Sequence, residues 1–82
     1  MIKEVVLVVT HTWSLGTMWD VSSYESMAEC ASKMREERDY YLGITIDSWD
    51  GKGKYSIDFQ IDTMVILTDI DGSKVTLFCA RL

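Results

Sequence analysis

The sequence predicts an α+β domain in which one helix packs on one face of an antiparallel, or mostly antiparallel, sheet. The segment Ser26–Arg38 is the only one with convincing helical periodicity, and β-branched or alternating apolar runs dominate the remainder. A single helix with one apolar stripe needs a sheet on which to bury that stripe. The expected order is ββαβββ(β), with four to five strands in one domain spanning residues 1–82.

The first two strands are expected to form a hairpin ahead of the helix. The run Ile2–Thr10 is β-branched and almost wholly apolar, which is typical of a central strand buried on both faces. A half-exposed strand around Thr17–Val21 would follow a turn at Ser14–Gly16. Gly16 would supply the positive φ that such a turn often needs.

The start of the helix is marked by a capping box. Ser26 and Glu29 have the spacing at which the serine oxygen accepts from a backbone N–H and the glutamate reaches back. Ser22 with Glu25 forms a second possible box one turn earlier, but a start at Ser26 lets Tyr24 enter the core just ahead of the cap. The apolar stripe that should face the sheet follows at helical spacing: Met27, Cys30, Ala31 and Met34.

After the helix, the chain alternates between strand patterns and turn residues. In Tyr55–Asp62 the odd positions are apolar and the even positions are polar, so one face of this strand should be apolar. The expected elements are a strand opened by Ile44 and Ile46, a hairpin tip at Trp49–Lys54, the strand Tyr55–Asp62, a bulge or bend near Asp62–Thr63, the run Met64–Leu67, a hairpin at Asp71-Gly72 and a closing strand Val75–Ala80.

Charge and composition exclude several classes of partner and location. The net charge of −5 and the scattered lysines and arginines disfavour direct binding to nucleic acid. No stretch approaches the length of a membrane span, and the N-terminus does not resemble a signal peptide, so the cytoplasm of the cell that makes the protein is the expected location. In that reducing setting we expect Cys30 and Cys79 to be free thiols that act as small core residues, with a disulfide as the alternative.

No set of catalytic or metal-binding residues stands out. His11 is the only histidine and lacks a nearby nucleophile in the sequence, so an ordinary loop hydrogen bond is the favoured interpretation. Two cysteines and one histidine do not complete a usual zinc site without carboxylates. Asp69–Ser73 fails the calcium-loop pattern, because Ala80 stands where a glutamate is required. We expect no cofactor, no metal and no enzymatic activity.

Aromatic and acidic residues near the turns are the best candidates for binding a partner. Trp49 adjoins an Asp-Gly turn, where burial is difficult, and exposed aromatic residues often anchor interfaces. The aspartates on and around the Tyr55–Asp62 strand would form an acidic outer sheet face, which either keeps the protein soluble or attracts a basic partner. The predicted partner-binding residues are Trp49, Asp50, Asp47, Tyr40, Tyr41, Asp58 and Asp62.

The helix start and the second cysteine also carry a resemblance. An aromatic-x-Ser-x-x-x-Cys helix start, here Tyr24, Ser26 and Cys30, follows a hydrophobic first strand and precedes a closing strand that holds Cys79. This pattern resembles small accessory proteins of bacteriophages and mobile elements, and Ile44–Asp69 departs from it as an insertion. The resemblance implies a protein that acts by occupying a host machine.

Three functions are therefore hypothesised. The first is a phage-type accessory protein that binds the basic surface of a host protein complex and inhibits it by occlusion, a defence system such as CRISPR being one target. The second is a domain that sequesters a small ligand between helix and sheet near Tyr24, Met27 and Met34. The third is a structural homodimer joined through an exposed sheet edge.

Overall fold

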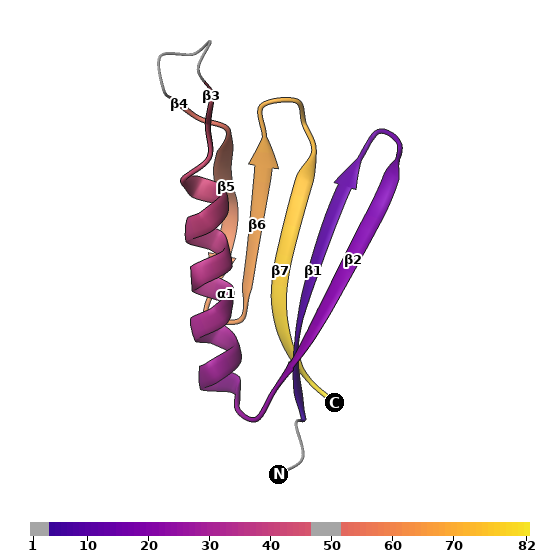
Figure 1. Ribbon diagram of the computed structural model, residues 1–82, viewed down its shortest axis with the longest axis vertical. Helices are drawn as coiled ribbons and strands as arrows, with labels where there is room; N and C mark the ends of the chain where they lie inside the picture. The colour runs from indigo at the N-terminus through magenta and orange to yellow at the C-terminus, as the bar shows by residue number, and fades with distance from the viewer. Residues whose placement is uncertain (1–3, 47–51) are drawn as a thin grey trace.

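The computed structural model describes residues 4–46 and 52–82, which form an α+β fold. Within them, five antiparallel strands make one sheet in the order β2-β1-β7-β6-β5, and helix α1 packs on one face of that sheet (Figure 1). This arrangement confirms the predicted fold class. The elements are β1 (Val5–Trp13), β2 (Gly16–Tyr24), α1 (Met27–Leu42), the two-residue pair β3 (Thr45–Ile46) and β4 (Lys52–Gly53), β5 (Tyr55–Ile61), β6 (Met64–Asp69) and β7 (Lys74–Arg81).

The closing strand β7 lies at the centre of the sheet, between β1 and β6. Its pairing with β1 joins the two ends of the chain, and the hairpins β1–β2 and β6–β5 extend the sheet on either side. The sequence predicts β1 as a central strand covered on both faces. Its place between β2 and β7 is confirmed, but the described elements cover only its helix-facing side, and β1 continues to Trp13 instead of ending at Thr10. The hairpin between β1 and β2 turns at Gly16, whose φ of 145° is positive as expected.

Helix α1 begins where the capping box predicts and ends one turn later than predicted. Ser26 is the N-cap, and its hydroxyl accepts from the backbone N–H of Glu29 at 3.1 Å. The helix does not stop at Arg38, because Tyr41 and Leu42 pack against the core and draw one more turn into the helix. It ends at Gly43, and Tyr40 and Tyr41 therefore lie in the last helical turn rather than in the following connection.

The core lies between α1 and the sheet face beneath it, and a disulfide crosses it. Cys30 and Cys79, which are 0% and 7% exposed, are bonded to each other with their Cα atoms 6.1 Å apart. The expectation of free thiols is therefore wrong, since the helix stripe meets β7 at a separation suited to a disulfide. The buried residues around this bond are Val5, Leu7, Met34, Tyr55, Val65, Leu67, Val75 and Leu77.

Strand β5 contains a bulge that changes which side chains face the helix. Ile57 pairs with Leu67 and Phe59 pairs with Ile66, so Asp58 has no partner in the ladder. The extra residue turns Phe59 to the face opposite the helix. The predicted alternation is therefore wrong beyond Ile57, and the slip expected near Asp62–Thr63 is a turn between two antiparallel strands.

Replacement of the N-cap should destabilise the fold by a measurable amount. Ser26→Ala removes the oxygen that accepts from Glu29, so we expect the free energy of unfolding to fall by about 1 kcal/mol. Ser22→Ala is the control, because Ser22 lies in β2 and caps nothing. Urea denaturation followed by circular dichroism measures both variants. A larger loss for Ser22→Ala would contradict this assignment of the helix start.

Reduction of the disulfide should have a larger effect. The bond closes a loop between residues separated by 49 positions, and such a cross-link contributes about 4 kcal/mol in the chain-entropy model. We expect the melting temperature of the wild-type protein to fall sharply when a reductant is added. The double variant Cys30→Ala/Cys79→Ala should melt at a low temperature that the reductant does not change. An unchanged wild-type melting temperature, with the thiols shown to be reduced, would refute this expectation.

Candidate interaction surface

The sheet face opposite α1 is apolar and is the most distinctive surface of the described residues. Strand residues alternate between faces, and the core residues identify the positions that face the helix. The remaining positions of β1, β2, β5, β6 and β7 face the other way. We call the apolar residues among them the open face: Val6, Val8, Trp19, Val21, Phe59, Ile61, Met64, Ile66, Phe78 and Ala80.

The register of the strands arranges the open face in rows that cross the whole sheet. Residues that pair directly across neighbouring strands lie side by side on the same face. One complete row, with an apolar side chain on all five strands, consists of Val21, Val8, Phe78, Met64 and Ile61. The next row contains Trp19, Thr10, Thr76, Ile66 and Phe59. The apolar side chains thus form one continuous surface.

Large parts of this surface are accessible to solvent. The side chains on its two outer strands are the most exposed: Trp19 is 70%, Val21 57%, Phe59 46% and Ile61 51% exposed. Residues on the inner strands, such as Phe78 and Ile66, are half-buried by their neighbours in the sheet. No element within residues 4–46 and 52–82 packs over the open face. One face of the sheet is therefore covered by α1 and the other is not.

The open face ends in a polar margin near the tips of the hairpins. Thr12 and Thr17 share a hydrogen bond of 3.2 Å between their hydroxyl oxygens. Asp58 accepts a hydrogen bond from the Thr68 hydroxyl, and its Oδ2 lies 3.3 Å from Lys74 Nζ. These contacts neutralise the charged side chains that the sheet strands place on this side of the molecule.

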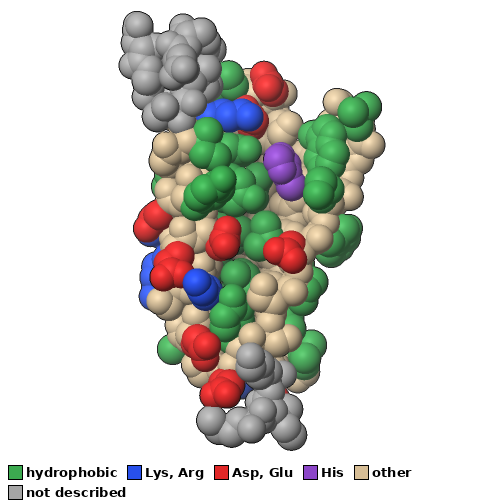
Figure 2. Space-filling model, in the orientation of Figure 1, with side chains coloured by type: hydrophobic (Ala, Val, Ile, Leu, Met, Phe, Trp, Pro, Cys, Tyr) green, Lys and Arg blue, Asp and Glu red, His purple; other side chains and the backbone are tan. Residues whose placement is uncertain are grey.

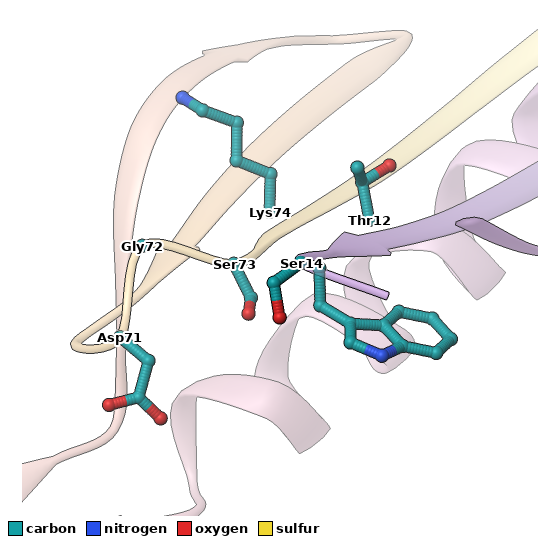
Figure 3. A pocket seen from close by; sticks show the side chains of 7 residues that line it. Thr12, Ser14, Asp71, Gly72, Ser73 and Lys74 are labelled. Atoms are coloured by element: carbon teal, nitrogen blue, oxygen red, sulfur yellow. The ribbon is translucent and has the colours of Figure 1, made fainter. Parts of the chain in front are cut away.

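Beyond this margin, a shallow cleft of about 630 Å³ separates the tips of the β1–β2 and β6–β7 hairpins. In Figure 3 the Ser14 and Ser73 side chains point the same way between the tips, whereas Asp71 and Lys74 diverge. The side chains do not converge on a common point, so the cleft lacks the focused polar groups of a small-molecule site.

The four predicted partner-binding residues that the structure describes do not form one cluster. Tyr40 is 66% exposed in the last turn of α1, whereas Tyr41 is half-buried and packs edge-on against Tyr55 with 5.2 Å between ring centroids. Asp58 belongs to the polar margin, and Asp62 lies in the exposed turn between β5 and β6. Of the aspartates expected on an acidic outer sheet face, Asp58 alone lies on that side among the described sheet positions, and the bulge places the apolar Phe59 and Ile61 beside it. Asp47, Trp49 and Asp50 lie outside the described residues.

The acidic side chains gather on the helix side of the molecule instead. Figure 2 shows them along α1 and between the helix and the β1–β2 hairpin. There, Asp20 and Glu37 flank a groove of about 180 Å³ together with Tyr41 and His11. Burial, followed by the nearby Tyr55 and Glu37, raises the pKa of Tyr41 above its ordinary value of 10.0. The helix side thus carries charged groups, with acidic side chains beside Lys33 and Arg38, whereas the opposite side is largely apolar.

The space proposed for a small ligand is filled by the protein itself. Met34 is fully buried in the core, and Tyr24 and Met27 pack against that core. Within the described residues, no group of three or more His, Cys, Asp or Glu side chains is placed to hold a metal ion. No described helix is long and apolar enough to cross a membrane.

The sequence carries a signal for most residues of the open face, but that signal predicts a face covered by the protein rather than a face open to solvent. In β1 and β7 the apolar residues occupy both odd and even positions, for example Val5–Val9 and Leu77-Phe78. That pattern is typical of strands covered on both faces. Phe59 and Ile61 have no such signal, because only the bulge at Asp58 brings them to this face.

The comparisons with protein families, curated proteins and solved structures find no match for this chain. The arrangement of the chain's own residues is therefore what indicates its function.

The ion pair in the polar margin predicts a pH dependence of stability. The Thr68 hydroxyl, and secondly Lys74, hold the pKa of Asp58 below its ordinary value of 3.8. A carboxylate whose pKa is lower in the folded state stabilises the fold above its unfolded pKa, and this contribution disappears as the pH falls through the folded pKa. We expect wild type to melt above Asp58→Asn at pH 6, and the difference to vanish as the pH falls below about 3.8.

Thermal melts from pH 6 to pH 2 measure this difference, with Asp62→Asn as the control. Asp62 lies in the exposed turn beyond the ladder, so its replacement should not produce the same pH-dependent difference. Equal melting temperatures of wild type and Asp58→Asn at every pH would contradict the role given to Asp58.

Proposed function

We propose that this protein acts by binding another polypeptide chain through the open face, as a binding protein rather than an enzyme. The observation that carries the proposal is the uninterrupted apolar row Val21, Val8, Phe78, Met64 and Ile61, which crosses all five strands without a described element over it. Removing such a surface from water is favourable, and it requires no catalytic group.

The size of the open face supports this proposal. Adjacent strands lie ~4.8 Å apart and same-face residues along a strand ~6.7 Å apart, so the face measures roughly 24 by 20 Å. Its projected area of roughly 500 Å² is comparable with the largest apolar patches on monomeric proteins, which are often functional. Scattered single apolar residues on a surface need no explanation, but a continuous patch of this size does.

A second candidate function uses the opposite side of the molecule. Occlusion of a basic host protein surface, which the resemblance to phage accessory proteins implies, is supported by the net charge of −5 and the acidic helix side (Figure 2). Tyr40 lies exposed on that side and would serve as an aromatic anchor. Inhibition of a defence complex is the specific form of this second proposal.

The cytoplasm of the host cell is the location that we propose for either function. Disulfides are rare in reducing compartments, and the Cys30–Cys79 bond therefore needs protection there. Both cysteines are buried between α1 and β7, which restricts the access that thiol–disulfide exchange requires. Burial of the bond thus supports its persistence in the presence of cellular thiols.

Site-specific photo-crosslinking tests the choice between the two sides. A photoreactive phenylalanine analogue replaces Phe59 or Trp19 on the open face, and Tyr40 on the helix side, in the cells that produce the protein. We expect one discrete adduct with a polypeptide from positions 59 and 19, because both lie on the surface that is covered on binding. The measurement is the mass of the adduct on a denaturing gel.

The control is the same analogue at Ser32, an exposed helical position outside both proposed anchors. An adduct from position 40 alone would support occlusion by the helix side and contradict binding through the open face. If positions 59 and 19 give no adduct while the variants fold normally, the first proposal is wrong.

A further inference from the structure

Both faces of the sheet carry the sequence pattern of a covered surface, yet the described chain covers only one. In β1, the helix-facing Val5 and Leu7 alternate with Val6 and Val8 on the open face. In β7, Leu77 faces the core and Phe78 the open side. Continuous apolar strands of this kind occur where both faces are buried. The second cover must therefore supply an apolar surface of similar extent.

The charges on this side restrict what the cover can be. Among the open-side positions of β1, β2, β5, β6 and β7, the charged side chains are Asp58 and Lys74, and these pair with each other at the polar margin. The open face thus offers no net charge to a basic or an acidic partner. The protein's net charge of −5 resides elsewhere, so two copies would bring apolar rows together without burying like charges.

The dimensions also suit a second sheet. A face of roughly 24 by 20 Å with projecting side chains presents on the order of 700 Å² of accessible surface. Two such faces would bury about 1,400 Å², which lies within the range of specific, stable interfaces. Two sheets packed in this way lie ~10 Å apart with their strands inclined at about −30°, so neither sheet needs to deform.

We infer that the polypeptide on the open face is a second copy of this chain, which forms a two-fold symmetric sheet-on-sheet homodimer. This inference rests on the proposed function and names its partner. A two-fold contact uses the same patch on both copies, and the row through Val8, Phe78 and Met64 within that patch is apolar on all five strands. The two helix sides then face outward and remain free.

The test is the mass of the purified, oxidised protein in solution, measured by sedimentation equilibrium over a range of concentrations. We expect twice the 9.4 kDa of one chain. Val21→Glu and Ile61→Glu place a carboxylate on the two outer strands of the open face, at positions that are already half-exposed in one copy and tolerate the charge in the folded monomer. Each should raise the dissociation constant of the dimer by at least ~100-fold, because the charge would be buried without a partner.

Ser32→Glu is the matched control, since it adds the same charge on the exposed surface of α1. It should leave the dissociation constant unchanged, and circular dichroism should show all variants folded. A wild-type protein that stays at the mass of one chain at a concentration of ~100 µM, which is ~100 times a dissociation constant of ~1 µM, would overturn the inference. A dimer that both open-face variants leave intact, as one joined at a sheet edge would be, also overturns it.

The crosslinking experiment separates this outcome from failure of the proposed function. An adduct from Phe59 at twice the mass of the chain supports the homodimer. An adduct at another mass, together with a monomeric purified protein, overturns the homodimer and leaves binding through the open face standing. No adduct from Phe59 or Trp19, with folded variants, overturns both.

Discussion

The disulfide between Cys30 and Cys79 ties the only described helix to one side of the sheet, and the two-sided character of the molecule follows from that attachment. A helix of 16 residues is about 24 Å long and about 10 Å wide, whereas five strands span roughly 24 Å. One helix therefore shields part of one face. The bond joins residues from different halves of the chain, so the helix stays with the central strand β7 even though a chain of this size has a small core.

This attachment also explains where the charge lies. Residues of α1 that face away from the sheet must be hydrated, and they supply many of the acidic side chains seen on the helix side in Figure 2. The strands have no such requirement on the opposite side, where the charged residues Asp58 and Lys74 lie at the margin and polar residues within the face, such as Thr10 and Thr76, are uncharged. A partner that binds by charge and a partner that binds by apolar contact would thus meet different sides of the same molecule.

The sequence predicts the fold well because its strongest signals are local. The cap at Ser26, the stripe through Cys30 and Met34, and the Asp71-Gly72 turn each depend on a few neighbouring residues, and the structure bears out each of them. The end of the helix and the disulfide depend on tertiary packing, which spacing alone does not reveal. The candidate surface is less predictable still, since its outer edge on β5 depends on whether one residue pairs with β6 or stays unpaired in a bulge.

That residue is Asp58, and its position links the length of a strand to the chemistry of a surface. Because it is the unpaired residue of the β5 bulge, deletion of Asp58 would leave Ile57 and Phe59 at their present ladder positions. The apolar rows would survive such a deletion, but Lys74 would lose its carboxylate partner. In evolutionary terms, deletion of this one codon would alter the electrostatics of the face but keep its apolar rows. A shift of register that removes the bulge would instead replace the apolar residues of β5 on this face with polar ones.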